Sequence, residues 1–215
     1  MKKIICVFLL FSIMISSGCS FFNNGYYYDI KNFSGDLHFP EEIEIDDFAN
    51  NWYSEQLTAL EEPVIPAQTD ENKSIYRFTC LGTFHHPFSI RIEINEKDES
   101  AILFFKMSSG AGGYDPGELM TSEQKNLESD EIKSLIEMME KYNYWKMPFD
   151  ENFSGGQDGS RWIIEMLKDG KYHAISRWTP QYRERYENDV LVKVDRIGDL
   201  DAVYELGMLF RELSE

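Results

Sequence analysis

The stretch that decides the fold is Arg161–Trp178, which reads RWIIEMLKDGKYHAISRW. Two runs of β-forming residues flank Asp169-Gly170, and Asp-Gly in this position is the strongest short signal of a hairpin with a two-residue type I′ turn. In that register Glu165 lies on one face of the hairpin. The pairs on the other face are Met166 with His173, Ile164 with Ile175, and Trp162 with Arg177.

Upstream of this hairpin the chain shows further strand patterns, most regularly at Phe88–Asn95, where apolar and polar residues alternate as in a half-buried strand. Apolar residues at helical spacing predict three helices. The expected strands cover about 74–81, 88–95, 101–107 and 119–127, and the expected helices run from Asp46 or Asp47 to Leu60, from a Ser129 cap to Tyr142, and onward from Gly198 or Asp199. The order α-βββ(β)-α-ββ-α predicts an α+β fold, mainly an antiparallel sheet of about five to six strands with three helices.

Composition excludes two broad classes of protein. Hydrophobic residues make up 42% of the 215 residues, which is enough for a packed core and excludes general disorder. The chain carries 38 Asp and Glu against 21 Lys and Arg, so its formal net charge is −17. Nucleic-acid binding needs clustered Lys and Arg, and we expect no nucleic-acid partner. The same acidity permits electrostatic steering toward a basic protein partner.

The N-terminus predicts export. A basic Met1-Lys2-Lys3 precedes the apolar run Ile4–Ile15, which is too short to span a bilayer and is typical of a signal peptide. The following Ser16-Ser17-Gly18-Cys19 resembles the lipobox of bacterial lipoproteins, with Ser16 where Leu is usual. The resemblance implies that Cys19 is diacylated on its sulfur and becomes the mature N-terminus. Plain secretion and a retained N-terminal anchor remain open alternatives.

These features divide the chain into a signal peptide (1–18), a lipidated N-terminus and tether (19–45), and a single α+β domain (46–215). Cys80 is the one cysteine left after lipidation, so the mature lipoprotein would hold no internal disulfide; without lipidation, a Cys19–Cys80 bridge is the competing hypothesis. The resemblance places the protein in the cell envelope as a lipid-anchored protein. Ser20, rather than Asp, after the cysteine implies the periplasmic face of the outer membrane if the cell is Gram-negative.

Four segments stand out along the chain: Phe84–Pro87 (FHHP), Ser109–Gly117 (SGAGGYDPG), Tyr144–Pro148 (YWKMP), and the hairpin region from Asp158 to Pro180, with DGSRWIIE, GKYH and RWTP. Together and in this order they resemble the motifs of a family of uncharacterised bacterial proteins. The family implies kinship but lends no established activity.

Chemistry-bearing residues in these segments form a candidate binding patch. No HxH or HxxxH spacing is present, so no metal or other cofactor is predicted. The absence of a Gly-x-Ser-x-Gly motif leaves no catalytic residue assigned. The glycine-rich loop is a candidate anion cradle without a P-loop lysine. If it folds over the hairpin, Arg177, His173, Tyr114 and Asp115 meet. The complete candidate patch is His85, His86, Tyr114, Asp115, Asp158, Trp162, His173 and Arg177.

Three functions fit these observations. The first is a non-enzymatic, membrane-anchored binding or interaction module on the outer face of a membrane, held there through Cys19. The second is an exported hydrolase that uses His85 or His86 with Asp115. The third is an immunity-type protein that neutralises a basic toxin.

Overall fold

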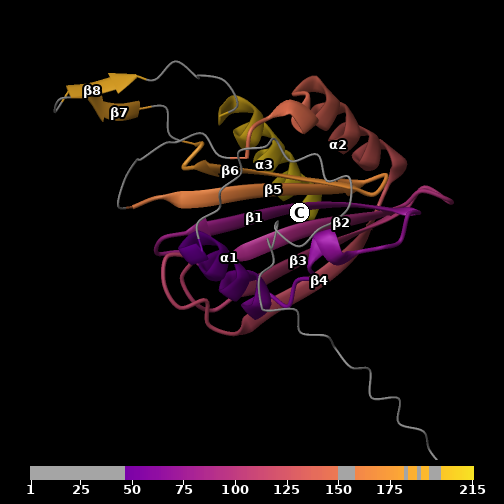
Figure 1. The fold of residues 1–215 in the computed structure, drawn as a ribbon, viewed down its shortest axis with the longest axis horizontal. Helices are drawn as coiled ribbons and strands as arrows, with labels where there is room; N and C mark the ends of the chain where they lie inside the picture. The colour runs from indigo at the N-terminus through magenta and orange to yellow at the C-terminus, as the bar shows by residue number, and fades with distance from the viewer. Residues whose placement is uncertain (1–46, 150–157, 182–183, 188–189, 194–199) are drawn as a thin grey trace, which may run out of the picture.

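A computed structural model describes residues 47–149, 158–181, 184–187, 190–193 and 200–215 (Figure 1). The signal peptide, the lipobox and the tether lie outside these residues. The elements are α1 (Asp47–Ala59), η2 (Ile65–Ala67), β1 (Lys73–Gly82), β2 (Phe88–Asn95), β3 (Ser100–Ser108), β4 (Leu119–Leu127), α2 (Ser129–Lys141), η3 (Tyr144–Lys146), β5 (Ser160–Lys168), β6 (Lys171–Trp178), β7 (Glu184–Glu187), β8 (Val190–Lys193) and α3 (Leu200–Ser214). No described helix is long and apolar enough to cross a membrane.

The predicted α+β class is confirmed. Six antiparallel strands form one sheet in the order β4-β3-β2-β1-β5-β6, and three helices accompany it. The hairpin register is also confirmed, because Trp162 pairs with Arg177 and Met166 with His173 around the Asp169-Gly170 turn. The small β7–β8 hairpin was not predicted. Its two strands have four residues each and, among the described residues, pair only with each other. Strands this short, outside the main sheet, have no clear alternation of apolar and polar residues in their sequence.

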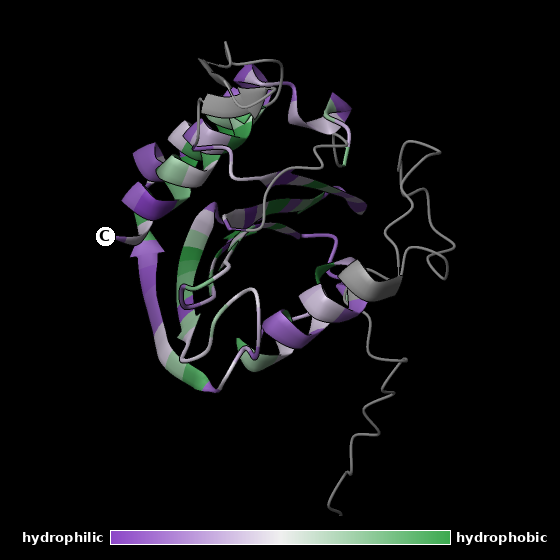
Figure 2. Cartoon of the chain, turned by 90° about the vertical axis from the view of Figure 1, so that its left-hand side faces the viewer, coloured by the Kyte–Doolittle hydropathy of each residue, from purple (hydrophilic) through white to green (hydrophobic). Residues whose placement is uncertain are grey.

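One face of the sheet, the apolar face, carries the main hydrophobic core. Phe78 of β1 points into it and packs against Trp162 of β5, with ring centroids 5.1 Å apart, and against Phe210 of α3 at 5.9 Å. Leu135 brings α2 onto the same face. Figure 2 shows α2 and α3 together on one side of the sheet and α1 on the other. Burial of each large apolar side chain contributes roughly 1.5–3 kcal/mol, which makes this face the chief source of hydrophobic stabilisation.

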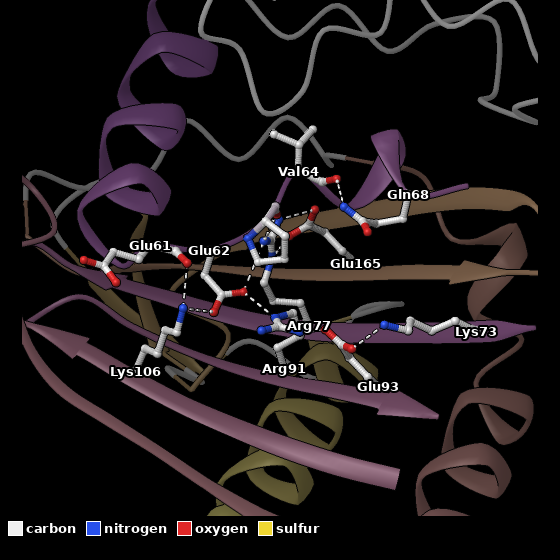
Figure 3. Close-up of polar contacts among 11 residues, drawn as sticks. Glu61, Glu62, Val64, Gln68, Lys73, Arg77, Arg91, Glu93, Lys106 and Glu165 are labelled. Atoms are coloured by element: carbon white, nitrogen blue, oxygen red, sulfur yellow. Dashed lines mark hydrogen bonds and ion pairs between the residues drawn. The ribbon is translucent and has the colours of Figure 1, made fainter. Parts of the chain in front are cut away.

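The opposite face, the polar face, holds a buried charge network of Glu62, Arg77, Arg91 and Glu165 (Figure 3). Arg77 donates to Glu165 in a two-bond pair, with Nε–Oε2 at 2.6 Å and Nη2–Oε1 at 2.8 Å. Glu62 accepts from Arg77 at 3.3 Å and from Arg91 at 2.9 Å. Glu62 lies just after α1, so the network ties the segment between α1 and β1 to the sheet.

The expectation of a half-buried β2 is therefore wrong. Ser89 and Arg91 stand on its polar side, yet they are only 0% and 5% exposed. The reason is tertiary, because α1 and the segment after it return across this face. Tyr53 and Leu57 of α1 pack there on Leu81.

Two local expectations also need correction. Ser129 begins α2 but does not cap it; Glu128 is the cap residue, and its backbone N–H donates to the Glu131 carboxylate at 2.7 Å. A glutamate three residues into a helix reaches back in this way because the first backbone N–H groups have no helical partner. Of the aromatics in Tyr144–Pro148, Tyr144 enters the core, whereas Trp145 is 40% exposed.

Candidate functional site

Three of the motif segments meet at one end of the sheet, around Thr83. The Thr83 backbone N–H donates to the carbonyl of Gly159 at 2.8 Å, and the Gly159 N–H donates back to Thr83 Oγ1 at 3.1 Å. From the glycine-rich loop, the N–H of Gly113 donates to the carbonyl of Thr83 at 3.2 Å and that of Gly112 to the carbonyl of His85 at 3.0 Å. The turn after β1, the loop after β3 and the start of β5 are thus one hydrogen-bonded unit.

Close packing explains why this loop is rich in glycine. A Cβ on Gly112 would lie 2.7 Å from the backbone of Leu81, and one on Gly110 would lie 2.0 Å from the carbonyl oxygen of Asp115. Gly117 has φ +68°, a conformation that glycine adopts without a steric penalty. The backbone N–H groups from Ser109 to Tyr114 all donate within the chain, so the loop does not offer the anion cradle that its glycines suggested.

The unit presents two aromatic rings to solvent. Phe84 is 62% exposed and Tyr114 is 61% exposed, and their rings stack with centroids 5.9 Å apart. His85, His86 and Asp115 surround them and are exposed as well. We call these five residues the aromatic corner. Gln56 of α1 supports it by donating from Nε2 to the carbonyl oxygen of Tyr114 at 3.1 Å.

Two cavities flank the stacked rings. The first, of about 500 Å³, is bordered by Phe84, both histidines, Asp158, Trp162 and Arg211. The second, of about 600 Å³, lies between α1 and the glycine-rich loop, with Glu55, Asp115 and Tyr114 at its wall. The corner therefore joins an aromatic and imidazole-lined hollow to an acidic one.

The tautomer of His86 follows from its hydrogen bond. Its Nδ1 lies 2.8 Å from the carbonyl oxygen of Gly110. A carbonyl only accepts, so Nδ1 carries the proton and the neutral ring has its lone pair on Nε2. His86 is therefore held in one orientation by the loop, with its second nitrogen available to a ligand.

Cys80 borders the first cavity but is not an activated nucleophile. Burial raises the pKa of its thiol to about 12, and the positive charge of Arg211 offsets only part of that effect. A thiol with this pKa is protonated at neutral pH, whereas nucleophilic attack needs the thiolate. Cys80 accordingly fits a packing role beside Phe88 and Trp162, its neighbours on β2 and β5.

The structure does not bring the eight predicted patch residues together. His85, His86, Asp158 and Trp162 border the first cavity, and Tyr114 and Asp115 border the second. His173 and Arg177 border neither of these two cavities; both are buried on the edge strand β6, where Arg177 pairs with Trp162. The patch proposed for Tyr114, Asp115, His173 and Arg177 does not form, because the loop folds over the turn after β1 instead of over the hairpin.

His173 and Arg177 hold a segment of backbone against the edge of the sheet. His173 Nε2 donates to the carbonyl of Met147 at 2.9 Å, and Arg177 donates to those of Pro148 and Phe149 at 3.1 and 2.9 Å. Burial lowers the pKa of His173, which favours the neutral ring. These contacts give both residues a structural role on β6.

Sequence reasoning missed Phe84, Glu55 and Arg211 as site residues. Phe84 directly precedes His85 and His86 in the sequence. A large apolar residue within a turn is a signal that could have identified it as a site residue. Glu55 and Arg211 come from helices that only the tertiary fold brings to this end of the sheet. Within the described residues no group of three His, Cys, Asp or Glu side chains is placed to hold a metal ion.

Comparison of the chain with models of known protein families gives no match, and comparison with curated proteins gives none either.

Proposed function

We propose that this protein is a lipid-anchored interaction module of the bacterial cell envelope and that it binds a protein partner at the aromatic corner. The observation that carries the proposal is the exposed stack of Phe84 on Tyr114. Exposed aromatic groups framed by polar side chains are typical of interaction sites, because rings supply large contact areas with few rotatable bonds.

The rigidity of the corner supports the same function. Thr83, next to Phe84, is joined to Gly159 by a backbone hydrogen bond, and Gln56 ties Tyr114 to α1. A surface held in one conformation loses little conformational entropy on binding, which favours affinity.

Charge indicates the chemistry of the partner. Glu55 and Asp115 face the hollow beside Tyr114, and the whole chain has a formal net charge of −17. We infer that the partner is basic and places a Lys or Arg side chain near these carboxylates. An immunity-type protein that neutralises a basic toxin is one protein of this kind.

The proposed membrane attachment depends on the N-terminal sequence. Removal of residues 1–18 takes away Lys2 and Lys3, so 19 basic residues remain from 21, against 38 acidic ones, and the formal net charge becomes −19. A domain this acidic is repelled by anionic lipid, whereas two acyl chains on Cys19 would anchor it stably.

The hydrolase alternative draws less support from the geometry. The Asp115 carboxylate accepts the N–H of Gly117 at 2.8 Å and borders a different cavity from His85 and His86. An imidazole and a carboxylate act together in catalysis when they lie within hydrogen-bonding reach of each other.

Site-specific photocrosslinking in intact cells tests the binding surface. The full chain would carry benzoylphenylalanine in place of Tyr114, and a control would carry it in place of Met208, which is 38% exposed on α3. We expect one basic protein to be crosslinked from position 114 and not from position 208. The same set of crosslinks from both positions would contradict the proposal.

The purified partner then allows a quantitative test. Phe84→Ala and Tyr114→Ala should each weaken binding roughly tenfold or more, as truncation of a central aromatic does. The matched control is Met120→Ala, which removes another exposed apolar side chain, 51% exposed, from β4. Unchanged affinity in the Phe84→Ala/Tyr114→Ala double variant would exclude the corner as the binding surface.

Mass spectrometry of the mature N-terminus tests the anchor separately. We expect the mature chain to begin at Cys19 and to carry two acyl chains attached through the sulfur of that residue. An unmodified Cys19, or a retained 1–18 segment, would refute lipid anchoring without bearing on the binding surface.

A further inference from the structure

A cavity of about 790 Å³ lies far from the aromatic corner. It opens between the end of α2, η3 and the tip of the β5–β6 hairpin, at the opposite end of β5 from Ser160. Its volume falls within the range of roughly 300–1,000 Å³ that small-molecule sites occupy. The apolar part of its wall consists of Tyr76, Ile136, Met139, Tyr144, Trp145 and Met166.

Two lysines border this cavity in an unusual arrangement. Lys168 and Lys171 are directly opposite each other across the hairpin, so both side chains leave the sheet on the apolar face, where the cavity opens. Like charges in this position repel and destabilise the strand pair. Glu140 and Asp169 also border the cavity, yet within the described residues neither lysine has a carboxylate within ion-pair distance.

We propose that this cavity binds a small amphiphilic anion, a linear hydrocarbon chain with a carboxylate head. The ammonium groups of Lys168 and Lys171 would receive the carboxylate, which removes their mutual repulsion. The hydrocarbon chain would lie against Met139 and Met166, whose unbranched thioether side chains adapt to flexible ligands. Trp145, which is 40% exposed, would cover the chain on the solvent side.

Calorimetric titration tests the charge requirement. The full chain with Cys19→Ser, which carries no acyl group of its own, would be titrated with dodecanoate below its micelle-forming concentration. Dodecyltrimethylammonium, with the same chain length and the opposite charge, is the matched ligand. We expect dodecanoate to bind at least about tenfold more tightly, because the lysine ammonium groups would donate charge-assisted hydrogen bonds to its carboxylate and repel the trimethylammonium head. Equal affinities, or no binding of dodecanoate, would overturn the proposal.

A matched pair of variants tests the role of the lysines. Lys168→Glu/Lys171→Glu should weaken dodecanoate binding roughly tenfold or more. Lys97→Glu/Lys133→Glu changes the net charge by the same amount at exposed positions that do not line the cavity, and should leave binding unchanged. Equal losses in the two variants would show a general charge effect and refute the site.

Methyl NMR locates the ligand. In chain labelled with ¹³C at its nine methionine methyl groups, dodecanoate should shift the signals of Met139 and Met166. Met120, exposed on β4, should not move. Shifts confined to other methionines would place the ligand elsewhere and contradict the assignment.

Discussion

The two faces of the sheet are buried by different physical means. The apolar face is covered by α2 and α3 through close packing around Phe78 and Phe210. The polar face is covered by α1 and the segment that follows it, through the charge network of Glu62, Arg77, Arg91 and Glu165. Both faces exclude water and both contain apolar contacts, which on the second face include Tyr53 and Leu57 on Leu81. Only the second face adds a buried network of ion pairs, which are directional contacts.

This difference bears on the candidate site. Packing of apolar side chains is non-directional, so the apolar face stabilises the sheet without selecting one position for the loops at its end. A two-bond Arg–carboxylate pair fixes geometry as well as supplying energy. Glu62, in the segment just after α1, joins that segment to the network, and Gln56 of α1 donates to the backbone of Tyr114. We therefore expect the polar face to control the aromatic corner.

The largest effect should come from breaking the polar face. Glu165→Ala removes the two-bond partner of buried Arg77 and should lower the free energy of unfolding by about 3–5 kcal/mol. Urea denaturation measures this. Glu137→Ala is the control, since its side chain is 64% exposed and its ion pair with Lys133 is worth little. A loss below about 1 kcal/mol for Glu165→Ala would contradict the difference drawn between the faces.

A smaller effect is expected from overfilling the apolar face. A Cβ on Gly207 of α3 would lie 2.5 Å from Cζ3 of Trp162, so Gly207→Ala should cost about 1–3 kcal/mol. The same denaturation experiment, with near-ultraviolet circular dichroism of the tryptophans, checks it. Met208→Ala, at the next and more exposed position, should be close to neutral. An unchanged stability for Gly207→Ala would show that this helix can shift freely on the sheet.

A pH-dependent effect should come from His173, at the edge of the apolar face. Burial lowers its pKa in the folded state, so the unfolded chain binds its proton first as pH falls. The contribution of the neutral ring is complete above the ordinary pKa near 6.5 and is lost as pH falls below it, by up to about 1.4 kcal/mol per pH unit. His173→Gln should show a shallower decline in unfolding free energy between about pH 6.5 and 5. An identical slope would refute the assignment.

The smallest effect on stability should come from the aromatic corner itself. Phe84→Ala removes an exposed ring and should change the free energy of unfolding by less than about 0.5 kcal/mol. Thermal and urea unfolding check this. A loss above about 1 kcal/mol would mean that the stack supports the fold, and reduced partner binding would then lose its simple interpretation.

Local patterns were sufficient to predict the six strands of the sheet and the register of its key hairpin. Alternating apolar and polar residues identify the strands. A two-residue Asp169-Gly170 turn fixes the register between β5 and β6, because its backbone twist matches that of the two strands. The burial of Ser89 and Arg91 was not predictable in this way. Their polar character suggested solvent, and only the return of α1 across the sheet buries them. The candidate site was predicted in part, since the motif turn and loop meet whereas His173 and Arg177 lie apart.

The sequence by itself determined the fold class, the strand order within each hairpin and the glycine-rich character of the loop beside His85 and His86. Periodicity and turn chemistry act between near neighbours, so a single chain displays them directly. The tertiary structure alone decided which residues support the fold from inside and which are exposed at the surface. Arg77 and Arg177 became buried supports, while Phe84 and Tyr114 became the exposed pair. The physical reason is that burial depends on which distant segment covers a residue, and no local pattern records that.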